Sequence, residues 1–238
     1  MNIIKIHNCD STNNYALSCR YTKLFSEGLV IVSDYQTSGK GQRGSSWISE
    51  RGKNLLVTIV IEPNLSIDKQ FELSKITSLS ILDCLESFGL NSKIKWPNDI
   101  LVDIKKISGI LIQNLISKNI ISHSVIGIGL NINQIKFENY ELAPTSLSLE
   151  LGNEYDIDEV QNRLLYCFQK RVSSYRNGVC INSDFNKGLF QKDKVSSFQS
   201  SMNKFDGIIR GVNDRGLLIV ETKNKIQEFD IKEIKMLF

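Results

Sequence analysis

The stretch SDYQTSGKGQRGSSWIS, residues 33–49, separates two apolar segments and decides between several folds. It contains the pattern G-x-G-x-x-G at Gly39, Gly41 and Gly44. A dinucleotide-binding loop with this pattern follows a strand and opens a helix. Here the strand-like segment NLLVTIVIEP at 54–63 follows instead, which argues against that fold. Protein kinases also place a glycine loop between strands, but neither H-R-D nor D-F-G occurs in the sequence.

The residue types of this loop indicate an anionic ligand that carries a ring. Glycines let the backbone approach a ligand closely, and their N–H groups can face anions. Lys40 and Arg43 bring two cations to the same place, and Trp47 can cover an apolar or ring-bearing group. A basic surface hairpin without a ligand remains the alternative at this point.

Composition narrows the functional class. The chain has 238 residues, of which 41% are hydrophobic and 23% charged, and its net charge is only +3. These values are typical of a globular protein and disfavour a dedicated nucleic-acid binder. Five irregularly spaced cysteines and two distant histidines predict no disulfide framework, metal site or Ser-His-Asp triad. With no secretory signal and no membrane-length apolar run, we expect a cytoplasmic protein.

Hydrophobic periodicity predicts two domains. Residues 1–190 should form an α+β domain, a mixed central β-sheet flanked by helices. Residues 191–238 hold short strands at close spacing and should form a small β-barrel. The expected helices lie at 10–25, 68–87 and 157–175. The expected strands of the first domain lie at 2–7, 28–36, 54–63, 92–102, 105–116 and 120–133.

Further polar groups interrupt the apolar strands. KWPNDIL at 95–101 carries Lys95, Asn98 and Asp99, KKISGIL at 105–111 carries Lys106, and IGIGLNIN at 126–133 carries Asn131. Taken singly, a solvated lysine or a hydrogen-bonded structural asparagine explains each of them. Their co-occurrence at strand ends indicates one shared binding site.

The ordered motifs DSTN (10–13), YQTSGKGQRGSSW (35–47), KWPND (95–99), KKISGIL (105–111) and GIGLNIN (127–133) resemble those of biotin protein ligases. The tail resembles the SH3-like C-terminal domain of that family. The resemblance implies an enzyme that uses ATP and Mg²⁺ to convert biotin to biotinyl-5'-adenylate. The enzyme then transfers biotin to a lysine of a biotin carboxyl carrier protein.

The resemblance also implies roles for individual residues. Lys106, Arg43 and Asp99 match catalytic positions of the family. The biotin-binding positions match Ser11, Thr12, Asn13, Gln36, Gly39, Lys40, Gly41, Trp47 and Lys106. The ATP- or adenylate-binding positions match Arg43, Gly44, Trp47, Lys95, Asn98 and Asn131.

Two loop residues depart from the family pattern, because Lys40 and Gln42 stand where arginine is common. Some family members carry an N-terminal DNA-binding domain. DSTN begins at residue 10, so we expect a ligase without nucleic-acid or membrane partners, as a monomer or homodimer. The alternatives are a lipoate or octanoate ligase or transferase of related fold, and a non-catalytic biotin or nucleotide sensor.

Overall fold

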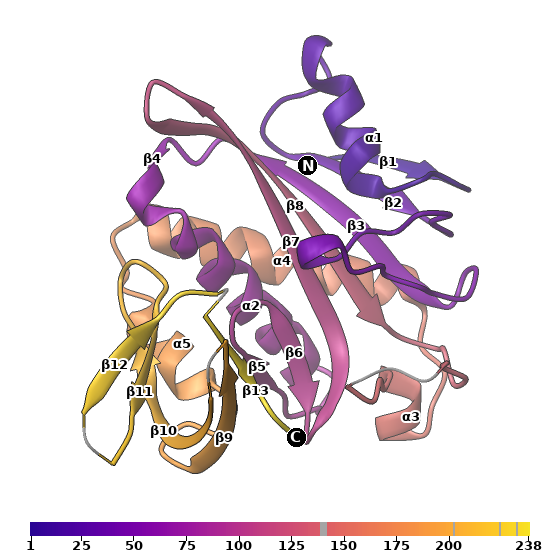
Figure 1. The fold of residues 1–238 in the computed structure, drawn as a ribbon. Coiled ribbons are helices and arrows are strands. Elements are labelled where there is room, and N and C mark those ends of the chain that lie inside the picture. The colour runs from indigo at the N-terminus through magenta and orange to yellow at the C-terminus, as the bar shows by residue number, and fades with distance from the viewer. Residues whose placement is uncertain (139–141, 202, 224, 232) are drawn as a thin grey trace.

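The computed structural model describes residues 1–138, 142–201, 203–223, 225–231 and 233–238, without the side chain of Arg43. Its larger sheet is mixed, as predicted, and runs in the order β1-β2-β3-β8-β7-β6-β5, with β4 paired to β8 (Figure 1). Only the β1–β2 pair among these described strands is parallel. The strands are β1 (Asn2–Ile6), β2 (Leu29–Ser33), β3 (Asn54–Ile61), β4 (Leu65–Ser66), β5 (Lys93–Lys95), β6 (Asp99–Val102), β7 (Lys105–Ser117) and β8 (Ile120–Asn131).

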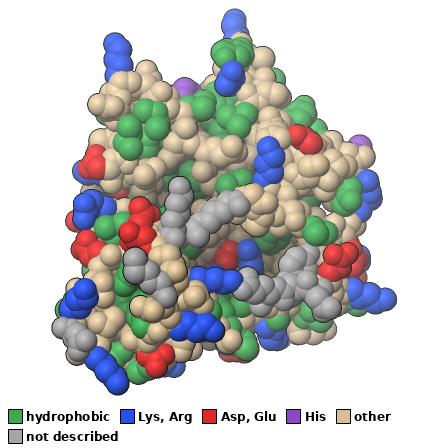
Figure 2. Space-filling model, viewed as in Figure 1, with side chains coloured by type: hydrophobic (Ala, Val, Ile, Leu, Met, Phe, Trp, Pro, Cys, Tyr) green, Lys and Arg blue, Asp and Glu red, His purple; other side chains and the backbone are tan. Residues whose placement is uncertain are grey.

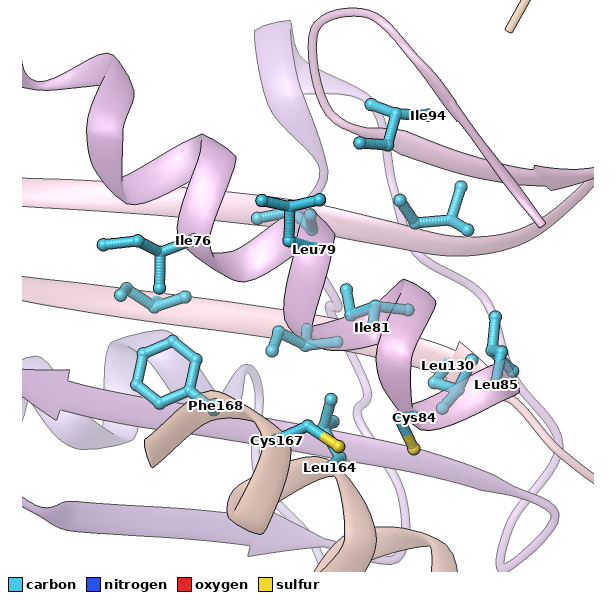
Figure 3. Close-up of a cluster of buried hydrophobic side chains, with 14 of the residues drawn as sticks. Ile76, Leu79, Ile81, Cys84, Leu85, Ile94, Leu130, Leu164, Cys167 and Phe168 are labelled. Carbon is cyan, nitrogen blue, oxygen red and sulfur yellow. The ribbon is translucent and has the colours of Figure 1, made fainter. Parts of the chain in front are cut away.

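Alternating residues of the central strands face two different helical layers. Val30 and Val32 of β2 pack into the main core with α2 (Phe71–Glu86) and α4 (Ile157–Arg176). Leu29 and Ile31 face the opposite way, toward Ala16 of α1 (Thr12–Ser18). The two-residue period of a strand therefore sorts helices onto both faces of the sheet. Figure 3 shows the main core, where Ile76, Leu79 and Leu85 of α2 meet Leu164 and Phe168 of α4.

The C-terminal residues form a second, antiparallel sheet in the order β12-β11-β10-β9-β13. Its strands are β9 (Val195–Ser200), β10 (Lys204–Val212), β11 (Leu218–Glu221), β12 (Ile226–Phe229) and β13 (Ile234–Met236). No hydrogen-bonded ladder joins β12 to β13 within the described part of the chain, so the sheet is open at that point. Phe198, Ile209, Leu218 and Ile234 nevertheless belong to the same buried cluster as α2 and α4.

Short elements account for most differences from the expected boundaries. The first helix ends at Ser18 and is followed by one 3-10 turn, Cys19–Tyr21, instead of reaching residue 25. Ser18 Oγ and Thr22 Oγ1 donate to the carbonyls of Tyr15 and Cys19, a local competition that ends helices. The periodicity also did not predict α3 (Leu147–Leu151), α5 (Asn182–Gly188) or β13.

Candidate active site

A cavity of about 380 Å³ lies on the face of the sheet that carries α1. Figure 2 shows this side of the molecule hollowed between the central sheet and the C-terminal strands. The cavity brings together most of the sequence-predicted residues, although they come from segments far apart in the chain. Those that line it are Ser11, Thr12, Asn13, Gln36, Lys40, Gly41, Trp47, Lys95, Asn98, Asp99 and Lys106.

One end of the cavity is a buried polar cluster at the start of α1. Gln36 Oε1 accepts from the backbone N–H of Thr12 at 2.8 Å and from its hydroxyl at 3.0 Å. Asn13 Nδ2 donates to Gln113 Oε1 at 2.9 Å, and Thr58 Oγ1 donates to Asn13 Oδ1 at 2.7 Å. Thr12, Asn13 and Thr58 are all at most 4% exposed, so their polar atoms are held away from bulk water. Such a cluster can recognise a small planar group rich in donors and acceptors.

Two glycines that face each other across the sheet form the floor beneath Trp47. Gly109 of β7 pairs with Gly129 of β8. A Cβ on Gly129 would lie 2.4 Å from Trp47 Cε2, and one on Gly109 would lie 3.0 Å from Cζ3. The indole therefore rests directly on backbone, which a larger side chain at Gly129 would prevent. Trp47 Nε1 is buried without a hydrogen-bond partner among the described residues, and it can donate to a ligand.

The opposite end of the cavity is charged. Asp99 Oδ1 lies 2.6 Å from Lys106 Nζ, and Asp99 Oδ2 lies 3.1 Å from Lys95 Nζ. The Asp99 side chain is 13% exposed, so these ion pairs are partly shielded from solvent. Lys106 Nζ also lies 5.6 Å from the ring centre of Trp47, within range of a cation–π contact. Two ammonium groups at one end of a cavity can stabilise negative charge that develops on a phosphate.

A β-bulge aims Lys106 into the cavity. Ile100 pairs with Ser108, but Leu101 pairs with Lys106, so Ile107 is an extra residue in β7. Regular alternation would put residues 106 and 109 on opposite faces. With the bulge, Lys106 Nζ lies only 3.3 Å from the position of a Cβ on Gly109, and both residues line the cavity.

Backbone and side-chain contacts hold Lys106 from behind. Its N–H donates to Ala143 O and its carbonyl accepts from Thr145 N, each at 2.8 Å. Glu150 of α3 pairs with Lys105 at 2.7 Å and accepts from Thr145 Oγ1. Burial raises the pKa of Glu150, but the Lys105 and Thr145 hydrogen bonds outweigh it and lower the pKa below its ordinary value.

Three of the predicted site residues, Gly39, Gly44 and Asn131, are not among the described residues that line the cavity. Gly39 packs behind Trp47, where a Cβ would lie 2.4 Å from Trp47 O. Gly44 ends the short turn Gln42–Gly44 with a φ of +81°, a conformation that favours glycine. Asn131 is 4% exposed, and its Nδ2 donates to Thr145 O at 2.9 Å, so its contact with adenine stays a prediction. The side chain of Arg43 lies outside the description.

The two loop positions that depart from the family pattern differ in their surroundings. Lys40 Nζ donates to Asn14 Oδ1 at 3.1 Å, which links the glycine loop to α1. Gln42 lines the cavity and is half-buried, so it can face a ligand.

Some residues that lie behind the site belong to none of the sequence motifs. Thr58 is a hydroxyl in the apolar strand NLLVTIVI, and that polar interruption was a usable signal. Gln113 gave a similar signal within β7. Trp96 and the C-terminal residues Leu218 and Met236 also line the cavity, and no local pattern predicted this.

Residues 6–131 match the model of the biotin/lipoate A/B protein ligase family. The chain belongs to this family. The matched segment includes the polar cluster, the glycine loop, Asp99 and Lys106.

Relatives of this family member align along most of the chain. It is 28% identical over 220 residues to the bifunctional ligase/repressor BirA of Bacillus spizizenii, covering 88% of this chain and 66% of that protein. The chain thus spans just under two thirds of that relative's length. It is 27% identical over 221 residues to the biotin–[acetyl-CoA-carboxylase] ligase of Paracoccus denitrificans, covering 89% of this chain and 90% of that one.

Solved structures show the same fold. The biotin protein ligase from Aquifex aeolicus in complex with biotin and ATP superposes with a TM-score of 0.83 at 23% identity. The superposition covers 99% of this chain and 98% of that one, including the C-terminal strands, and confirms the predicted fold class. None of the helices described here is long and apolar enough to cross a membrane.

Proposed function

We propose that the protein is an ATP-dependent biotin–protein ligase, which forms biotinyl-5'-adenylate and transfers biotin to a lysine of a biotin carboxyl carrier protein. One observation carries the proposal. A single cavity has a buried cluster of neutral hydrogen-bonding groups at one end and the Lys95–Asp99–Lys106 row at the other. Biotin has a ureido ring at one end and a carboxylate at the other, so its polarity matches that of the cavity.

The first step is an electrostatic problem that this arrangement suits. An oxygen of the biotin carboxylate bonds to the α-phosphorus of ATP, and the bond to pyrophosphate breaks. Lys106, with Arg43 and Lys95, stabilises the charge on the oxygens of the α-phosphate. Among the described residues no group of three or more His, Cys, Asp or Glu side chains could hold a metal ion. Mg²⁺ therefore suits the chemistry as an ion bound mainly through ATP phosphates.

The second step transfers the acyl group. The amine of the carrier lysine bonds to the carbonyl carbon of the adenylate, and AMP leaves with the electrons of the broken C–O bond. The Asp99 carboxylate orients that lysine, and the glycine loop with Trp47 keeps water from the adenylate. The ureido ring is bound by Ser11, Thr12, Asn13 and Gln36. Asn131 contacts the adenine ring of the nucleotide.

Biotin is favoured over lipoate, which the family description also includes. A dithiolane ring and an acyl chain offer no hydrogen bonds to the polar cluster, whereas a ureido ring offers both donors and an acceptor, so the cluster adds affinity for biotin and none for lipoate. A non-catalytic sensor would not need Lys106, whose side chain is held at the cavity by the bulge and by the 143–145 segment.

We also infer a domain boundary at 190/191. It is supported by Phe190 N donating to Ile94 O, while Lys192 pairs with Ile209 of β10.

The test is the transfer of labelled biotin to a purified biotin carrier domain by the full chain with ATP. We expect ATP-dependent label that survives denaturation of the carrier, release of AMP, and no competition by excess lipoate. A carrier whose acceptor lysine is replaced by arginine is the matched control and should stay unlabelled. Absence of labelling, or equally efficient use of lipoate, would overturn the proposal.

A further inference from the structure

The turn between β10 and β11 touches the part of the molecule that carries Asp99. Trp96 Nε1 donates to Gly216 O at 3.0 Å. Gly216 has a φ of +88°, and a Cβ there would lie 2.3 Å from Cγ of Phe71, the first residue of α2. The turn thus fits closely between α2 and the loop of residues 96–98, with no room for a side chain at Gly216.

This turn is itself held in one conformation. Asn213 Oδ1 accepts from the backbone N–H groups of Arg215 at 2.9 Å and Leu217 at 3.0 Å. Asp214 Oδ1 accepts from Asn182 Nδ2 at 2.7 Å. A hydrogen-bonded turn of this kind presents the Gly216 carbonyl at a defined place.

A buried lysine anchors the same turn to α2. Asn182 Oδ1 accepts from Lys75 Nζ at 2.6 Å, and Lys75 pairs with Glu72 at 2.8 Å. The Lys75 side chain is 1% exposed, and a charge so deeply buried requires partners of this kind. The chain of contacts runs from α2 through α5 to the C-terminal sheet.

The loop that carries Trp96 is held on both sides. On the side of β7, Asn98 Nδ2 donates to Ile110 O and Ile110 N donates to Asn98 O, each at 3.0 Å. On the side of the C-terminal sheet, Trp96 bonds to Gly216. Asp99 follows directly, with its carboxylate between Lys95 and Lys106.

We infer that Trp96 is a positioning residue, whose indole N–H, held by the Gly216 carbonyl, keeps the Asp99 carboxylate aligned with Lys106. The inference rests on the proposed function, because the turnover that it concerns is that of carrier biotinylation. It goes beyond that function because it gives the C-terminal sheet a part in aligning the reacting groups. The bond from the Trp96 N–H to Gly216 O links the 96–98 loop to the C-terminal part of the chain, and small misplacements of catalytic groups are costly.

The test compares two variants that each remove one hydrogen bond across the same interface. Trp96→Phe keeps an aromatic ring but lacks the N–H donor. Asn186→Ala removes the acceptor of Val212 N, a 2.9 Å bond between α5 and β10 that involves no residue of the 96–99 loop. Both variants are made in the full-length chain. The measurements are kcat of carrier biotinylation, KM for biotin and for ATP, and amide hydrogen exchange.

We expect Trp96→Phe to lower kcat roughly three- to tenfold, with both KM values within about twofold of the parent. Hydrogen exchange should quicken in residues 95–99. Asn186→Ala should lower the unfolding temperature. Its kcat should stay within about twofold of the parent value, and hydrogen exchange in residues 95–99 should be unchanged. A Trp96→Phe variant with parental kcat, or an equal loss of kcat in Asn186→Ala, would overturn the inference.

Failure of the proposed function gives a different result. In that case the parent chain itself labels no carrier. The hydrogen-exchange comparison needs no activity, and it still decides whether Trp96 holds the loop. Unchanged exchange at residues 95–99 in Trp96→Phe would refute the positioning role whatever the reaction.

Discussion

Thr58 shows how a single hydroxyl in the sheet supports the polar end of the cavity. It is fully buried, and its Oγ1 donates to Asn13 Oδ1 while lying 2.8 Å from Thr12 Oγ1. Gln113 receives the Asn13 amide from the other side at 2.9 Å. With both ends of the amide engaged, Asn13 has one orientation before any ligand arrives.

Replacing Thr58 with valine should weaken biotin binding. The change keeps the shape but leaves Asn13 Oδ1 without its donor, so affinity should fall by roughly five- to thirtyfold. Calorimetric titration of biotin measures the effect, and Thr58→Ser, which restores the hydroxyl, should regain most of the affinity. Equal affinities for the valine and threonine proteins would contradict the role of Thr58.

Replacing Lys106 with alanine should reduce adenylate formation by about 10²-fold or more, because an ammonium group at the reacting phosphate is lost. Single-turnover release of pyrophosphate measures this step. Lys170→Ala is the matched control, since Lys170 is an exposed lysine of α4 that does not line the cavity. Activity of the Lys106 variant within about threefold of the parent would remove Lys106 from its role.

Among the elements, β7 and α3 act together to present Lys106. The bulge in β7 turns its side chain, and α3 supplies Glu150, which holds Lys105 and Thr145 beside it. Ser146 caps α3 by accepting from Leu149 N at 3.2 Å, so this short helix is fixed at its start. The placement of the Lys106 side chain thus depends on an element remote from it in sequence.

Glu150 should make stability depend on pH in the acid range. Its pKa in the folded protein lies below the ordinary value of 4.5, so its contribution is present above that pH and is lost as pH falls through 4.5 and below. Urea unfolding of the parent and Glu150→Gln at pH 7, 5 and 4 measures this. The stability difference between the two proteins should shrink as pH falls, and a constant difference would contradict the assignment.

At the scale of the whole molecule, both sheets share one core. Phe198, Ile209, Leu218 and Ile234 of the C-terminal sheet are buried in the cluster that contains α2 and α4. The second sheet therefore buries its apolar face against the first domain. Removing residues 191–238 would expose that part of the core, so deletion cannot separate a binding role from a structural one.

We expect the two parts to unfold together. Amide exchange in β3 reports on residues 1–190, and amide exchange in β10 reports on the C-terminal sheet. The two probes should give one midpoint in urea. Ile209→Ala, a buried truncation, should lower the unfolding free energy by about 2–5 kcal/mol and move both midpoints equally. Separate midpoints would show independent domains.

Local periodicity and motif order determined much of this protein from the sequence alone. Alternating or continuous apolar runs located the central strands, and the helical spacing at 157–175 located α4 to within one residue of its end at Arg176. The ordered motifs identified the family and most residues that line the cavity. These signals are local, because each depends only on neighbours within a few turns or pleats of the chain.

Tertiary structure alone decided which of these residues act together. Strand register set the bulge at Ile107, which reverses the face expected for Lys106 relative to Gly109. Pairing between distant segments brought Gln113 to Asn13 and the Gly216 carbonyl to Trp96. Register and domain packing arise from contacts between residues far apart in the chain, and no local pattern records which partner each residue will meet.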